Sequence, residues 1–113
     1  MRRTVVETAA FLAAARRCLS DDECAAVVDL IAADPERGVL IRGGGGLRKV
    51  RFGIGGRGKR GGARVVYYFP GDNVPIFLLT VFAKNEKANL TKAELNSLAA
   101  ASKLLARTYR VRQ

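Results

Sequence analysis

Histidine and tryptophan are both absent from this sequence of 113 residues, and cysteine occurs only twice. Without histidine, the chain lacks the usual acid–base side chain and the commonest metal ligand. Cys18 and Cys24 are too far apart for a CxxC pair, so neither a zinc site nor a redox motif is indicated. Two-metal nuclease chemistry needs clustered carboxylates. The basic segment of this chain has none, because most of the ten acidic residues lie in or beside the first two predicted helices. The sequence therefore predicts no metal and no cofactor.

Long hydrophobic runs are also lacking. The apolar run at residues 9–15 is short and ends at Arg16 and Arg17, which does not fit a signal peptide. The run at residues 76–83 is far too short to span a bilayer. The length suits one domain over residues 1–113. We expect a cytoplasmic protein with no membrane partner.

Positive charge dominates what is present. Twenty Lys and Arg face ten Asp and Glu, which gives a net charge of +10. Eight of these cations lie between Arg42 and Arg64, a segment without a single acidic residue. Such a domain usually binds a polyanion, with nucleic acid as the first candidate and a membrane surface as the second. The alternative is an ordinary solvated surface, but those surfaces normally mix both signs of charge.

Hydrophobic periodicity and turn residues predict a mixed α+β fold. Ser20 with Glu23, and Thr91 with Glu94, have the spacing of capping boxes that start helices. Strands are predicted at residues 3–6, 47–52, 63–69 and 76–83, and helices at 8–19, 20–34 and from 91 onward. The first two helices form a hairpin, and the last two strands form an antiparallel hairpin. We expect an antiparallel sheet with the helices packed on one face.

One glycine-rich segment imitates a nucleotide-binding loop. Residues 53–59 read GxxxxGK, but Arg60 stands where a P-loop needs Ser or Thr, and a strand follows instead of a helix. Nucleotide hydrolysis is therefore not predicted. Arg57, Lys59 and Arg60 are better interpreted as cations on a glycine-rich loop that binds an RNA backbone.

RNA carries its own nucleophile, the 2′-hydroxyl, so a chain without metal or histidine can still cleave it. Arg and Lys stabilise the charge that develops on the phosphate. Strand alternation places Lys49 and Arg51 on one face, and Arg64 and Tyr68 on one face of the next strand. Lys84 follows the last strand in the same alternation. The alternative is that these cations only position phosphates, and that Tyr68 packs in the sheet instead of stacking on a base.

Three blocks of residues, in order, resemble the RelE superfamily of toxins, and the HigB-like branch in particular. These blocks are GGLRKVR at 45–51, GKRGGARVVYY at 58–68, and KNE at 84–86 followed by Leu90 and Thr91. Together the resemblance covers residues 43–98, and the preceding helical hairpin also fits. It implies a microbial-ribonuclease-like fold and the toxin of a type II toxin–antitoxin pair. It further implies a ribosome-dependent endoribonuclease that cuts mRNA in the A site of the 70S ribosome.

The resemblance also assigns partners and residue roles. A cognate antitoxin is expected to neutralise the toxin, and the two together to bind operator DNA. Lys49 and Arg51 match the family's two basic strand residues, Arg64 matches its transition-state arginine, and Lys84 begins its last basic cluster. Arg48 and Asn85 join the RNA-binding candidates.

Two positions depart from the family pattern, because Asn85 replaces an arginine assigned as the acid and Leu90 falls near a stacking tyrosine. The acid is then Lys84, Lys59 or Arg60, and the stacking residue is Tyr68 or Tyr109. Two other functions fit the same charge pattern: a nucleic-acid-binding module without enzymatic activity, and a ParE-like inhibitor of gyrase.

Overall fold

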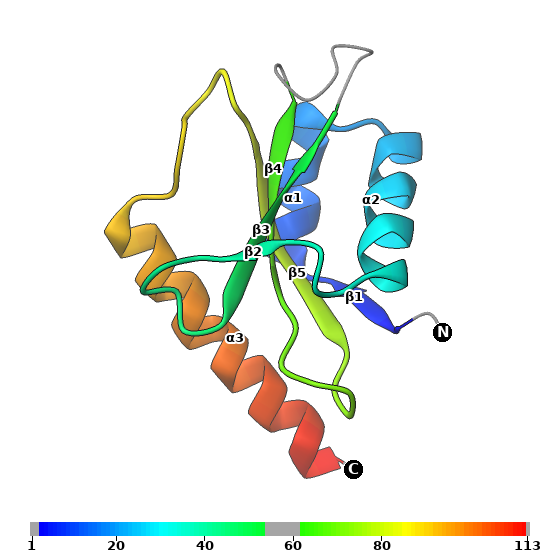
Figure 1. Cartoon of the computed structure of the whole chain (residues 1–113), viewed down its shortest axis with the longest axis vertical. Helices are drawn as coiled ribbons and strands as arrows, with labels where there is room; N and C mark the ends of the chain where they lie inside the picture. The colour runs from blue at the N-terminus through cyan, green and yellow to red at the C-terminus, as the bar shows by residue number, and fades with distance from the viewer. Residues whose placement is uncertain (1–2, 54–61, 113) are drawn as a thin grey trace.

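The computed structural model describes residues 3–53 and 62–112. Its elements, in chain order, are β1 (Val5–Glu7), α1 (Ala9–Cys18), α2 (Asp21–Ala33), β2 (Val39–Leu40), β3 (Leu47–Phe52), β4 (Ala63–Tyr68), β5 (Ile76–Ala83) and α3 (Lys92–Arg112) (Figure 1). The strands β3 and β5 have the predicted bounds, and the other predicted elements agree to within two residues. The strand β2 was not predicted, because two residues are too few to show alternation.

Both predicted capping boxes are present. The Ser20 hydroxyl accepts from the Glu23 amide at 3.1 Å, and the Glu23 carboxylate accepts from the Ser20 amide at 2.9 Å. Thr91 and Glu94 make the same reciprocal pair at 3.1 and 2.8 Å. These bonds satisfy amides that have no partner within the helix, so they fix where α2 and α3 begin.

The strands form one sheet in the order β1-β5-β4-β3-β2. The pairs β3–β4 and β4–β5 are antiparallel, as predicted, and the unpredicted β2 also pairs antiparallel with β3. The remaining pair differs, because β1 runs parallel to β5 with Val5 opposite Ile76. No hairpin joins β1 to β5, and the long chain between them leaves either direction open.

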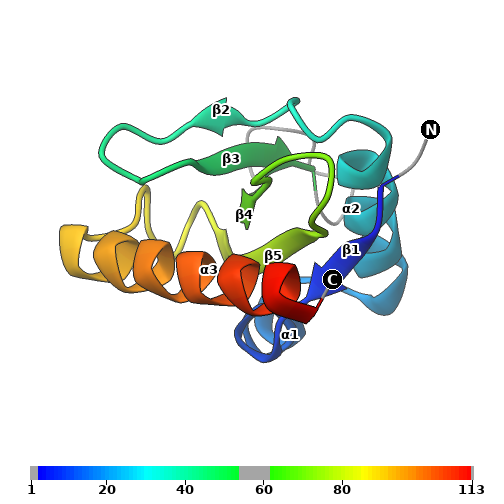
Figure 2. The ribbon, with the colours of Figure 1, turned by 90° about the horizontal axis from the view of Figure 1, so that it is seen from below.

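Helices cover both faces of this sheet, whereas the sequence predicted one. Phe11 of α1 and Val27 and Ile31 of α2 pack against one face. Leu95 and Leu98 of α3 belong to the cluster on the other face, and Figure 2 shows α3 and α2 on opposite sides of the sheet. The reason lies in β5, where every residue except Thr80 is buried. A strand that is apolar on both faces must be covered from both sides.

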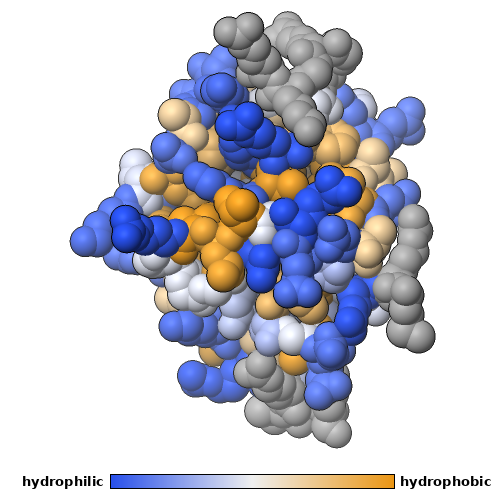
Figure 3. Space-filling view, in the orientation of Figure 1, coloured by the Kyte–Doolittle hydropathy of each residue, from blue (hydrophilic) through white to orange (hydrophobic). Residues whose placement is uncertain are grey.

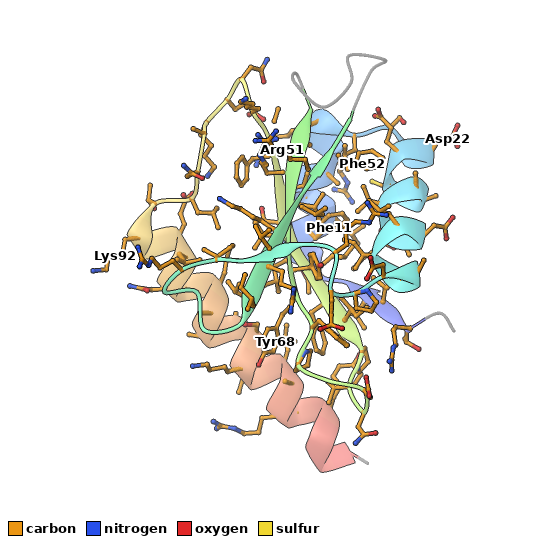
Figure 4. The ribbon with its side chains drawn as sticks, viewed as in Figure 1. Phe11, Asp22, Arg51, Phe52, Tyr68 and Lys92 are labelled. Carbon is orange, nitrogen blue, oxygen red and sulfur yellow. The ribbon has the colours of Figure 1, made fainter. Side chains whose placement is uncertain are left out.

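The helix α3 covers only part of its face of the sheet, and the uncovered part is where a site can form. In Figure 4, α3 runs past Tyr68 at the lower end of the sheet, while Arg51 lies near the upper end. Residues 84–91, which join β5 to α3, arch beside that upper end (Figure 1). Among the described residues, no helix is both long and apolar enough to cross a membrane.

Candidate functional site

A cationic cleft of about 540 Å³ lies between the open part of the sheet and residues 84–91. The four residues predicted to act on RNA, Lys49, Arg51, Arg64 and Lys84, all line it. Its remaining lining residues are Arg37, Val39, Val50, Ala88 and Asn89. We call this cavity the cationic cleft. No Asp or Glu is among the described residues that line it, so its positive charges are not neutralised from within.

The antiparallel register of β3 and β4 brings these cations together. Lys49 and Arg51 share one face of β3, while Val50 packs against the helical hairpin on the other face. Arg64 of β4 lies directly opposite Arg51 of β3. Lys84 follows β5, and its backbone amide donates to the Gly62 carbonyl at 3.0 Å. Residues far apart in the sequence thus meet through strand pairing.

Arg64 is the one buried cation among the described residues that line this cleft. Its exposed fraction is only 8%, and its Nη1 is fully buried without a hydrogen-bond partner among the described residues. Burial lowers the pKa of the guanidinium from its ordinary value, and the charge of Arg51 lowers it further. Like charges placed directly opposite across a sheet are also unfavourable. An anion bound in the cleft would stabilise such a buried cation, because it would supply the missing hydrogen-bond acceptor and an opposite charge.

Three other predicted residues are held elsewhere. Arg48 does not line the cationic cleft, because its Nη1 donates to the carbonyls of Glu36 at 3.2 Å and Gly38 at 2.7 Å. Tyr68 is half-buried in the cluster beneath α3, at the opposite end of the sheet from Arg51 (Figure 4). Tyr109 packs edge-on against the Phe77 ring at 5.3 Å. Both tyrosines therefore serve packing here.

The remaining predicted residues divide into two groups. Asn85 is exposed on the 84–91 segment but does not line the cationic cleft. Arg57, Lys59 and Arg60 lie outside the described residues, as does most of the GxxxxGK segment. In the part of the chain that is described, no group of three or more His, Cys, Asp or Glu side chains is placed to hold a metal ion.

Sequence reasoning missed two residues of the cleft, Arg37 and Asn89. Arg37 lies in the link between α2 and β2, and Asn89 lies in the link between β5 and α3. Neither link has a periodicity that would assign its residues to a face. The available signal is proximity to the end of a helix, since Arg37 lies shortly after α2 and Asn89 shortly before α3.

A smaller cleft of about 290 Å³ adjoins the first and shares Lys49 and Asn89 with it. Its other lining residues are Leu40, Ile41, Arg42, Val66, Phe82, Leu90 and Leu95. We call it the apolar cleft. Figure 3 shows blue hydrophilic side chains at the upper end of the sheet and an orange hydrophobic patch over β2 below them. Val39 and Leu40 of β2 are each 62% exposed.

Comparison with known proteins gives two findings. The sequence profile described as "RelE toxin of RelE / RelB toxin-antitoxin system" matches residues 3–111. A solved structure of a double-arginine mutant of the E. coli toxin RelE in the free state is similar to this fold, with a TM-score of 0.58 and 20% sequence identity. The match covers 90% of this chain and 98% of that one.

Proposed function

Because the chain belongs to the RelE toxin family, we propose that it is a ribosome-dependent endoribonuclease that cuts mRNA in the A site. The observation that carries this proposal is the buried Nη1 of Arg64, which has no hydrogen-bond partner among the described residues and lies at the wall of a cleft that four further described cations line. A phosphate of RNA supplies the negative charge that this arrangement favours.

The reaction needs only groups that RNA and this chain provide. The 2′-oxygen attacks the adjacent phosphorus, the bond to the 5′-oxygen breaks, and the products are a 2′,3′-cyclic phosphate and a 5′-hydroxyl. Arg64 stabilises the additional negative charge on the phosphoryl oxygens in the transition state. Its burial strengthens that interaction, since a low local dielectric screens charges less.

Two proton transfers complete the reaction. One group removes the proton of the 2′-hydroxyl, and another protonates the departing 5′-oxygen. Lys49 and Lys84 are the amines that line the cationic cleft, from β3 and from the end of β5. We assign the two transfers to this pair, and we assign Arg51 to binding the phosphate beside Arg64. Arg37, which the sequence did not single out, extends the cationic surface at the β2 side.

The apolar cleft offers a place for a base next to the reacting phosphate. It shares Lys49 and Asn89 with the cationic cleft, and apart from Arg42 its other lining residues are aliphatic side chains and Phe82. Since Tyr68 and Tyr109 are used in packing, stacking on a tyrosine is not available at this position. Leu90, at the place of the family's tyrosine, lines the apolar cleft. We propose that apolar contact replaces stacking here.

The finer assignments rest on the sequence blocks already described. We propose that the chain belongs to the HigB-like branch and acts in the cytoplasm. A cognate antitoxin covers or distorts the cationic cleft, and the two proteins together bind operator DNA. The exposed Val39 and Leu40 beside the cleft support a protein partner at this edge.

Primer extension on a defined mRNA, with and without 70S ribosomes, tests the proposal. We expect cuts within codons only when ribosomes translate the message, and near-complete loss of those cuts in Arg64→Ala. The matched control is Arg107→Ala, which removes an exposed arginine of α3 that lines neither cleft. We expect this control to cut like the wild type.

Two results would overturn the proposal. If the wild type binds RNA but never cuts it, the chain is a binding module, and each lost cation should weaken binding to a similar extent. If it causes DNA damage and binds gyrase without arresting translation, it acts as ParE-like toxins do.

A further inference from the structure

Asn89 occupies the junction of the two clefts, where it lines both of them. It lies on the 84–91 segment, which several contacts hold against the rest of the structure. The Glu86 carboxylate accepts from the Ala83 amide at 3.3 Å. Lys87 donates to Glu94 at 2.7 Å and lies over the Phe82 ring at 5.3 Å. Asn89 is therefore presented from a segment that is anchored on either side of it.

The side chain of Asn89 contacts Lys49, one of the two amines assigned to proton transfer. The Lys49 Nζ donates to the Asn89 Oδ1 at 3.2 Å. An ammonium group can only donate hydrogen bonds, so the amide must turn its oxygen toward it. This bond links the middle of β3 to the 84–91 segment, across the boundary between the clefts. A lysine side chain is otherwise free to adopt many rotamers, and the contact restricts it.

The chemical nature of the acceptor matters as much as its position. Surface lysines commonly pair with carboxylates, but neither cleft has an Asp or Glu among its described lining residues. A carboxylate at position 89 would neutralise the amine locally and repel a phosphate. An amide oxygen accepts the same hydrogen bond without adding charge. The Lys49 charge therefore remains available to an anion.

We propose that Asn89 is a positioning residue, which holds the Lys49 amine at the junction of the two clefts and leaves its charge to the RNA phosphate. The inference rests on the proposed function, because it supplies the substrate whose phosphate Lys49 meets. It adds a second residue of the link between β5 and α3 to a site that already contains Lys84 of that link.

Three variants separate orientation from charge. Asn89→Ala removes the acceptor and leaves the net charge unchanged. Asn89→Asp keeps an acceptor and adds a negative charge. Asn96→Asp adds the same charge at an exposed position of α3 that lines neither cleft, and serves as the matched control. Since Asn89 is itself exposed, all three proteins are expected to fold, and thermal melting checks this.

Three measurements compare the variants with the wild type. The first is NMR relaxation of the Lys49 side-chain carbon next to the amine in ¹³C-lysine-labelled protein. The second is binding of a single-stranded 2′-deoxy oligonucleotide, which lacks the nucleophile, as a function of salt. The third is cleavage on ribosomes. For Asn89→Ala we expect a more mobile Lys49, an unchanged salt dependence of binding and about tenfold slower cleavage.

For Asn89→Asp we expect binding weakened about fivefold and a salt slope reduced by about 0.7, the loss of one phosphate contact. Asn96→Asp should leave the slope unchanged. The inference is overturned if Lys49 is equally ordered in Asn89→Ala, or if Asn89→Asp binds like Asn96→Asp. The NMR and binding measurements do not depend on cleavage, so a wild type that never cuts would refute the proposed function and still test the role of Asn89.

Discussion

Replacing Arg64 by methionine should make the protein more stable while abolishing its activity. Arg64 is 8% exposed, and its Nη1 is buried without a hydrogen-bond partner among the described residues. Such a group loses its hydration on folding and regains no equivalent contact. Methionine has a similar length and is apolar, so it fills the same space without the charge. A side chain kept for binding an anion is thus expected to destabilise the free protein.

The magnitude follows from the cost of one buried unsatisfied donor, which is about 1–3 kcal/mol. For a domain of this size, 1 kcal/mol corresponds to a shift in Tm of about 4 °C. We therefore expect Arg64→Met to raise the Tm by about 4–12 °C in a buffer without phosphate or sulfate. The matched control is Arg107→Met, which removes an exposed arginine of α3 that lines neither cleft. That exposed substitution should change the stability by less than about 0.5 kcal/mol.

An added anion supplies the second half of the test. Phosphate at ten times its dissociation constant should stabilise the wild type by about 1.4 kcal/mol, because it binds only the folded state. Arg64→Met should gain much less from the same addition. Differential scanning calorimetry with and without phosphate measures both effects. If Arg64→Met melts below the wild type in the buffer without phosphate or sulfate, Arg64 has a favourable structural contact, and it is not a cation held ready for an anion.

Two further predictions concern the supports of the site. The hydrogen bond from the Lys87 amine and, next to it, the bond from the Thr91 backbone amide together lower the pKa of the Glu94 carboxyl from 4.5 to about 2. A depressed carboxyl pKa stabilises the fold above pH 4.5, so the stability of the wild type should fall as the pH drops toward 2. In urea titrations Glu94→Gln should show a flatter pH profile. Tyr67→Phe should lower the stability by about 1–3 kcal/mol in the same titrations, because the Gly38 amide, which donates to the Tyr67 hydroxyl at 2.8 Å, would lose its buried acceptor; an unchanged stability would show that water replaces the hydroxyl.

Local signals in the sequence accounted for most of the elements. Capping boxes at Ser20 and Thr91 predicted two helix starts, alternation predicted the bounds of β3, and a continuous apolar run predicted those of β5. All helices were predicted on one face of the sheet, because the apolar pattern of β5 does not show which helix covers which of its two faces. The direction of β1 was likewise open, since its partner lies about 70 residues away. Short-range rules reach neighbouring residues, and these two features depend on pairs that are distant in the chain.

The candidate site was predictable to a similar extent. Alternation correctly grouped Lys49 with Arg51, and the structure brings Arg64 and Lys84 to the same cleft. The same reasoning could not tell that Tyr68 lies at the other end of the sheet, because residues on one face of a strand can be far apart along it. Arg48 shows the converse limit, since its charge suggested RNA binding while its guanidinium binds two backbone carbonyls.

The sequence by itself determined the kind of chemistry open to this protein. A net charge of +10 without histidine leaves Arg and Lys as the groups that act on a phosphate. Only the tertiary structure decided which of these cations line one cleft. The pairing of β3 with β4 puts Arg64 against Arg51, and the arch of residues 84–91 brings Asn89 to Lys49. Burial and missing partners are properties of the packed chain, because they depend on what surrounds a side chain and not on what precedes it.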